Sequence, residues 1–217
     1  MATPTGSEAA PAVDQPGRGV EGNARITGAV GAAIFGLLIV EGITILRIGD
    51  LLTMHVFVGM LLVAFAAVKI GSTGYRVVRY YAGDAAYTAK GPPHVVLRLL
   101  GPVVVITTVA VLGTGIAAVL AGRHTEWLVQ AHKASFIVWF GAMTVHVLGH
   151  IVETPALAVA DLRRQPGARR SGAAARLALF AATVACAVLL GVVGVGWAHH
   201  WQAAQPHKAK QAVARVR

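Results

Sequence analysis

The chain has 217 residues, of which 56% are hydrophobic and only 13% are charged. A soluble domain of this size normally has about a quarter of its residues charged, so lipid rather than water is the expected solvent for much of the surface. The net charge of +10 would favour nucleic-acid binding if the basic residues formed a stripe, but they lie between apolar runs. That distribution is typical of a membrane topology signal and excludes nucleic acid as an expected partner.

Five apolar segments are long enough to cross a bilayer as helices, since a spanning helix needs about 20 mostly apolar residues. They are residues 26–46, 51–70, 95–121, 127–151 and 173–197. The turn between the first two is short, which predicts a tight antiparallel pair. Pro155 follows the fourth segment and predicts its end. We therefore expect an all-α integral membrane bundle of about five transmembrane helices.

The remaining segments define the domain organisation. The Pro- and Gly-containing start of the chain is predicted to be a disordered tail, and a four-helix membrane domain follows it. A basic cytoplasmic loop, an extra fifth helix and a polar tail complete the chain; in order, the segments are residues 1–25, 26–153, 154–172, 173–198 and 199–217. The single cysteine, Cys186, lies in the fifth apolar run and is predicted to be a small buried hydrophobic residue.

Basic residues near the helix ends predict the orientation, because cytoplasmic loops retain positive charge. Two loops are strongly basic; they contain Arg76, Arg79, Lys90 and Arg98, and Arg163, Arg164, Arg169, Arg170 and Arg176. The two opposite loops carry only Arg47 and Arg123, each with an acidic residue nearby. A multi-pass protein of the plasma membrane with a cytoplasmic N-terminus is expected, although the basic C-terminal tail favours the opposite orientation.

Function has to be read from the ionisable residues inside the apolar spans. His55 lies on the second span, and His132, His146 and His150 lie on the fourth. His132 and His146 are fourteen residues apart, which places them near one helix face and about 21 Å apart along the axis. The second and fourth spans run in the same direction, so His55 and His132 are expected at the same depth.

Two imidazoles that face each other at one depth are what a six-coordinate haem b requires, because its iron takes one nitrogen from each side. Gly59 follows His55 by four residues on the same face, where a small residue lets a flat ring approach the backbone. Lys133 and Arg123, near the outer end, are expected to pair with the haem propionates. Any one of these histidines alone would more simply be an interfacial residue.

The pair His132 and His146 on the fourth span, together with His55 on the second, resembles the bacterial cytochrome b561 family. That family includes the membrane cytochrome b subunits of formate dehydrogenases and nickel-iron hydrogenases, and the resemblance covers about residues 26–153. It implies that His55 and His132 ligate the iron of an outer haem and that His146 ligates an inner haem. The family's remaining inner ligand is a histidine near the start of the first helix, where this chain has Arg25 and Ile26.

The second haem therefore depends on a substitute ligand. His94, just before the third span, could reach His146 or His150, and Lys69 follows His55 by the spacing that separates His146 from His132. A contact with a haem propionate or a lipid phosphate is the other interpretation of Lys69. Glu41, in the first span, either handles a proton or a quinol near the outer haem or is tied to Arg47 or a backbone group near the surface.

The expected function is that of a membrane-embedded b-type cytochrome, an electron-transfer subunit of an oxidoreductase rather than a stand-alone enzyme. It would carry electrons between a quinone pool or membrane partner and a redox partner protein. One alternative is a haem-free transporter subunit or scaffold whose histidines bind protons or bridge helices. Another is a membrane haem sensor or haem-delivery protein, which would use the same ligands.

Overall fold

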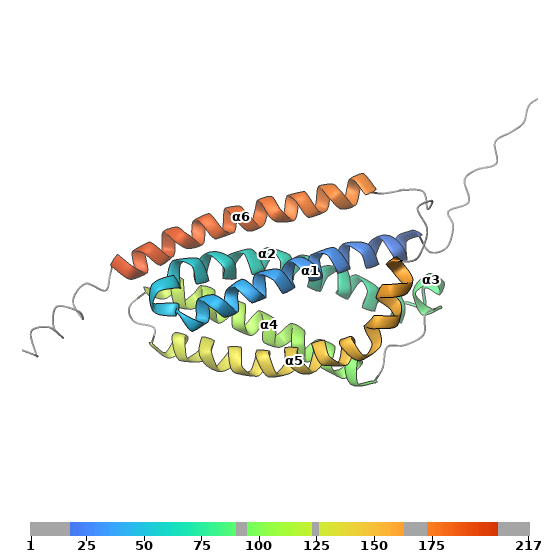
Figure 1. Cartoon of the computed structure of the whole chain (residues 1–217), viewed down its shortest axis with the longest axis horizontal. Helices are drawn as coiled ribbons and strands as arrows, with labels where there is room; N and C mark the ends of the chain where they lie inside the picture. Colours follow the sequence, from blue (N-terminus) through green and yellow to red (C-terminus); the bar gives the residue numbers. More distant parts are fainter. Residues whose placement is uncertain (1–17, 90–94, 123–125, 163–172, 204–217) are drawn as a thin grey trace, which may run out of the picture.

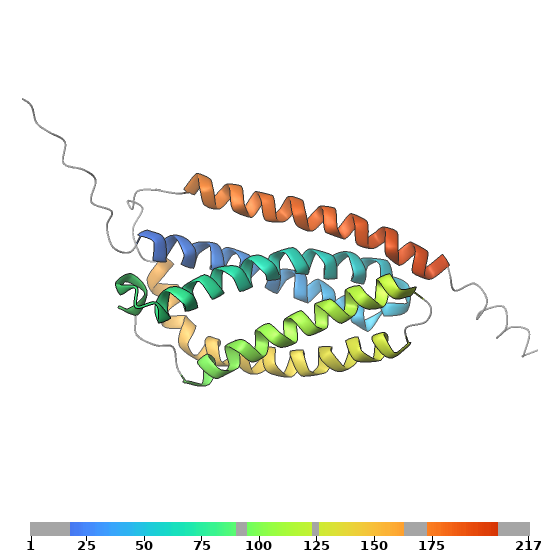
Figure 2. The same cartoon turned by 180° about the vertical axis from the view of Figure 1, so that it is seen from behind.

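The computed structural model describes residues 18–89, 95–122, 126–162 and 173–203. Every regular element in these ranges is a helix: α1 (Arg18–Leu46), α2 (Ile48–Tyr81), α3 (Ala85–Thr88), α4 (Val95–Ala121), α5 (Glu126–Leu162) and α6 (Ala173–Ala203). The five long helices lie side by side, and successive ones run in opposite directions (Figures 1 and 2). The predicted all-α helical bundle is confirmed.

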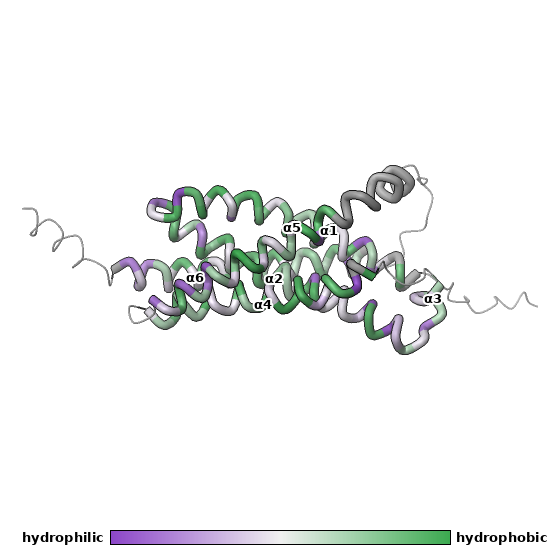
Figure 3. Tube along the Cα trace, turned by 90° about the horizontal axis from the view of Figure 1, so that it is seen from below, coloured by the Kyte–Doolittle hydropathy of each residue, from purple (hydrophilic) through white to green (hydrophobic). Residues whose placement is uncertain are grey.

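Within the described residues, four helices are long and apolar enough to cross a membrane: residues 22–46 of α1, all of α2, residues 98–121 of α4 and residues 174–202 of α6. Large apolar side chains, among them Phe35, Ile106 and Leu189, are exposed on their outer faces. Green apolar stretches follow the long helices over most of their length (Figure 3). Apolar exposure on this scale is unfavourable in water and favourable in lipid, so the fold is that of a multi-pass membrane protein.

The fifth predicted span lies on α5, which packs lengthwise against α4. The described part of α5 contains His132, Lys133 and His146. It is not one of the four helices that are apolar enough to cross a membrane by composition. A polar contact holds it to its neighbour, because the indole Nε1 of Trp139 donates to Thr108 Oγ1 at 2.9 Å. The tight pairing of the first two helices is observed, with Arg47 alone between α1 and α2.

Several helix ends differ from the predicted ones. The prediction of disorder through residue 25 is wrong for residues 18–25, which begin α1. Tertiary contacts explain this early start, because the Asn23 amide donates to the Ser72 carbonyl of α2 at 3.1 Å. At the other ends, α2 continues to Tyr81, α6 to Ala203, and α5 to Leu162 despite Pro155. Membrane helices tolerate proline when neighbouring groups satisfy the freed carbonyls.

The central helix α2 is held between α1 and α6. A buried cluster joins the three helices and contains Ile26, Val30, Ala64, Phe65 and Ala187. Close approach of α6 depends on two glycines: a Cβ at Gly191 would lie 2.6 Å from Phe57 and Leu61, and one at Gly194 would lie 2.6 Å from Met60. Cys186 is exposed, so its predicted burial is wrong. Its neighbour Ala187 occupies the buried position instead.

Candidate functional site

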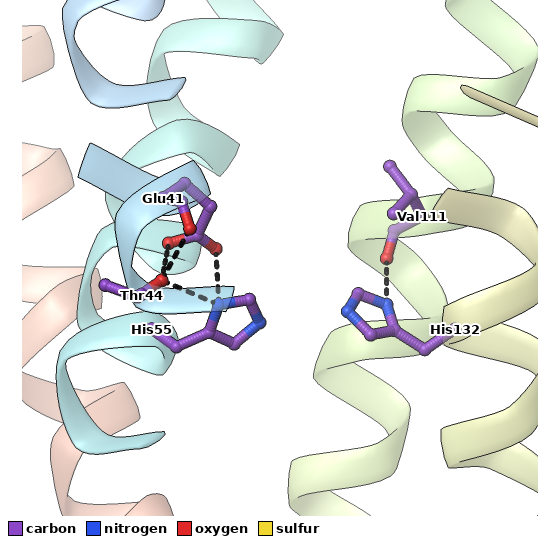
Figure 4. A network of polar contacts seen from close by, with 5 residues as sticks. All are labelled: Glu41, Thr44, His55, Val111 and His132. Atoms are coloured by element: carbon purple, nitrogen blue, oxygen red, sulfur yellow. Dashed lines mark hydrogen bonds and ion pairs between the residues drawn. The ribbon is translucent and has the colours of Figure 1, made fainter. Parts of the chain in front are cut away.

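His55 of α2 and His132 of α5 face each other across the bundle. The centroids of the two imidazole rings are 6.2 Å apart, and the ring planes are inclined by 71°. Figure 4 shows the two rings pointing toward one another from opposite sides. The structure thus brings together the two histidines that were paired on sequence grounds.

On the α2 side, the end of α1 supplies hydrogen-bond partners for His55. The Nδ1 atom of His55 is 3.1 Å from Glu41 Oε1 and 3.1 Å from Thr44 Oγ1. The side chains of His55 and Glu41 are only 19% and 13% exposed, and Thr44 is fully buried. Arg47 instead pairs with Asp50 at 3.4 Å, so the alternative that ties Glu41 to Arg47 is wrong.

On the opposite side, α4 supplies the partner for His132. Its Nδ1 donates to the Val111 carbonyl oxygen at 2.9 Å. This carbonyl is accessible because the residue one turn later is Gly115: a Cβ there would lie 3.0 Å from His132 Cε1 and 3.2 Å from Nδ1. Ser135 Oγ donates to the His132 backbone carbonyl at 2.9 Å and lies 3.1 Å from Thr114 Oγ1.

These contacts determine which nitrogen of each ring is free. The Val111 carbonyl can only accept, so His132 Nδ1 carries the hydrogen and its Nε2 keeps its lone pair. An ionised Glu41 carboxylate places the hydrogen of His55 on Nδ1 in the same way. The Nε2 atoms of His55 and His132 face each other (Figure 4). A metal-ligating histidine typically has this arrangement, with its other ring nitrogen held by a carboxylate or a carbonyl oxygen.

The two rings lie at an apolar cavity of about 410 Å³ that is lined by residues of the long helices and is partly open to the outside. Gly59 and Met60 of α2, Ile116 and Val119 of α4, and Trp197 and Trp201 of α6 are among the residues that line it. Its lining is predominantly apolar, and Lys133 is a basic residue among those that line it. The cavity therefore suits a largely apolar ligand with an anionic group.

The donor set fits a metal that brings its own equatorial ligands. Among the described residues, no three His, Cys, Asp or Glu side chains are grouped so as to hold a bare metal ion. A protein zinc site, by comparison, has three or four protein ligands. A porphyrin supplies four nitrogens to its iron and leaves one coordination position on each side, and two opposed imidazoles can fill these two positions. A metal–imidazole bond of about 2.0 Å puts two axial nitrogens about 4 Å apart, with the ring centroids farther back. The centroid separation of 6.2 Å accommodates that span.

Of the other predicted site residues, some line the cavity and some do not. Gly59 and Lys133 line the cavity. His146 lies farther along α5 with its Nδ1 buried, and it is not part of the cavity lining. His94, Arg123 and the side chain of His150 lie outside the described residues.

Lys69 lies in the other half of α2 and faces α1. Its Nζ donates to the Thr27 carbonyl oxygen at 2.9 Å and packs over Gly31, where a Cβ would lie 3.0 Å from Nζ. Lys69 is fourteen residues from His55, which corresponds to about 21 Å along the helix. It therefore belongs to a polar contact between α1 and α2 and not to the His55–His132 cavity.

Sequence reasoning missed the partners that hold the two rings. Gly115, one turn after Val111, indicates an accessible Val111 carbonyl only once His132 is known to face α4. The pairing of Glu41 with His55 follows from the short α1–α2 turn, which brings the end of α1 alongside the start of α2. Comparisons with models of known protein families, with curated proteins and with solved structures find no match.

Proposed function

We propose that this chain is a membrane-embedded b-type cytochrome in which His55 and His132 are the axial ligands of a haem b. One observation carries the proposal: two Nε2 atoms face each other at an apolar cavity, while an oxygen atom holds the Nδ1 atom of each ring. Two interfacial histidines with separate structural roles would have no reason to be oriented in this way.

Each group of the site has a distinct role in this proposal. The Nε2 atoms of His55 and His132 ligate the iron, and Glu41, Thr44 and the Val111 carbonyl hold the rings in the ligating orientation. The apolar lining excludes water, and Lys133 neutralises a propionate. Bound haem supplies the one-electron chemistry. Electrons would pass between a quinone pool or membrane partner on one side and a redox partner protein on the other.

The resemblance of His55, His132 and His146 to the ligand pattern of the bacterial cytochrome b561 family supports the same function. Membership of that family, location in the plasma membrane and a cytoplasmic N-terminus are parts of the proposal. The described residues support one haem, at the end of the bundle that contains His55 and His132. A second haem, ligated by His146, would need a partner other than Lys69, whose Nζ is engaged with Thr27.

The test is a reduced-minus-oxidised optical spectrum of the full chain, produced with haem available and purified in detergent. The wild type should show low-spin b-type bands, and a pyridine haemochrome titration should count the haems per chain. His55→Ala and His132→Ala should each lose the bands. His199→Ala is the matched control, because His199 is exposed on α6 and should be silent.

Two results would contradict the proposal. A wild-type protein without b-type bands would favour the haem-free transporter or scaffold. Unchanged bands in both His55→Ala and His132→Ala would show that haem binds elsewhere. If haem binds but no redox partner or quinone exchanges electrons with it, the protein is a haem sensor or delivery protein instead.

A further inference from the structure

The two proposed ligands have unequal hydrogen-bond partners. His55 Nδ1 faces the carboxylate of Glu41, whereas His132 Nδ1 faces the peptide carbonyl of Val111. We propose, on the basis of the proposed function, that Glu41 is a positioning residue that fixes the His55 ring and makes it the more electron-donating of the two ligands. A haem held between the two histidines would consequently have a lower reduction potential than a pair of carbonyl-bonded histidines would give it.

The carboxylate of Glu41 is itself held in place. The fully buried Thr44 hydroxyl lies 2.7 Å from the Glu41 backbone carbonyl and 3.2 Å from its Oε2, and Oε1 is the atom that faces His55. Gly59 of α2, one turn after His55, lies beside this carboxylate: a Cβ there would be in van der Waals contact with Oε1, at 3.4 Å. The groups on both helices therefore direct the carboxylate toward one nitrogen.

A carboxylate acceptor differs from a carbonyl acceptor in two ways. A hydrogen bond to an ionised acceptor is about twice as strong as a neutral one, so it leaves more electron density on the imidazole. The negative charge also stabilises the oxidised, more positive iron, and this interaction is strong in a low-dielectric bundle. Both effects lower the reduction potential.

The same pairing explains the presence of an acidic residue among apolar side chains. Ionisable residues within membrane helices are rare and mark functional sites, and they face a partner in the bundle. The partner of Glu41 is His55, and through it the proposed iron. Arg47, the nearest cation in the sequence, is paired with Asp50 at the surface instead.

The experiment is a potentiometric titration of the haem in the full-length wild type and in Glu41→Gln. The glutamine keeps an acceptor oxygen and removes the charge, so haem should still bind while the midpoint potential rises. Glu41→Ala removes the acceptor as well, so the potential should rise and haem occupancy should fall. Asp50→Asn is the matched control: its carboxylate is exposed at the same end of the bundle, and the potential should not change.

Thr44→Val provides a second measurement if Glu41→Gln fails to fold. This near-isosteric change keeps the carboxylate but removes a hydroxyl that lies 3.2 Å from Glu41 Oε2 and 3.1 Å from His55 Nδ1, so the potential should rise by less than in Glu41→Gln. The electron paramagnetic resonance spectrum of the ferric protein should change in parallel, because it reports the electron-donating strength of the axial ligands. A role of Glu41 in folding alone would leave both the potential and this spectrum unchanged.

The outcomes separate the two proposals. A haem-loaded Glu41→Gln with the potential and paramagnetic spectrum of the wild type would overturn the role of Glu41 and leave the cytochrome function intact. If only Thr44→Val folds, a potential and spectrum like those of the wild type in that variant would likewise overturn the role of Glu41. A wild type that binds no haem would overturn both proposals.

Discussion

Gly115 of α4 lies against the His132 ring of α5 so closely that a Cβ at this position would come within 3.0 Å of Cε1. The ring cannot move away without losing the hydrogen bond from its Nδ1 to the Val111 carbonyl. Helix α4 thus forms a rigid surface behind one of the two facing imidazoles, and this contact can be tested.

Gly115→Ala should weaken haem binding. The added methyl group must push the ring or the helix, and overpacking of this kind costs about 1–3 kcal/mol. A loss of about tenfold in haem affinity is expected, since that corresponds to about 1.4 kcal/mol. Haem titration into apoprotein measures it. Gly113→Ala is the control, because a Cβ at Gly113 would meet nothing within 4 Å. Equal affinities in the two variants would argue against the contact.

Gly191→Ala and Gly194→Ala should each destabilise the protein. Alanine has a higher helix propensity than glycine by about 1 kcal/mol, so a glycine with open space around it gains stability on this change. At these two positions, however, the methyl group would meet Phe57, Leu61 or Met60 at 2.6 Å. Thermal unfolding in detergent should show lower midpoints for both variants, with Gly196→Ala at or above the wild type. A higher midpoint for Gly194→Ala would contradict the close packing of α6 on α2.

Lys69→Met should leave the haem count and the optical spectrum unchanged. The Lys69 Nζ donates to Thr27 and lies about 21 Å along α2 from His55. Loss of one haem per chain in this variant would instead identify Lys69 as an inner ligand. The comparison is Lys133→Met, which removes the cation at the cavity and should weaken haem binding while the low-spin bands persist.

The orientation can be tested with single cysteines. Cys186→Ser provides the background; Gly49→Cys places an exposed thiol in the first turn of α2, and Ala89→Cys places one past the opposite end of α2. If the N-terminus is cytoplasmic, a membrane-impermeant thiol reagent added to intact cells should label residue 49. Residue 89 should react only after permeabilisation. The reverse pattern would invert the predicted topology.

Hydropathy predicted the helices because a bilayer sets their minimum length and excludes charge from their centres. It did not predict the start of α1, since residues 18–25 are polar and are held by contacts such as Asn23 with Ser72. The common direction of the second and fourth spans, which puts His55 and His132 at one depth, brought these two residues together. The roles of Gly115 and Glu41 depend on which helix faces meet, and the hydropathy of single helices carries no information on that.

The two facing imidazoles come from different packing groups. Helices α1 and α6 pack on α2, which carries His55, while α5, which carries His132, packs on α4; contacts between these groups are far sparser than those within them. The hydrogen bonds that hold each ring therefore lie within its own group. If haem binds between the two imidazoles as proposed, it would join the two groups, and a chain without haem should separate more readily along the boundary between them.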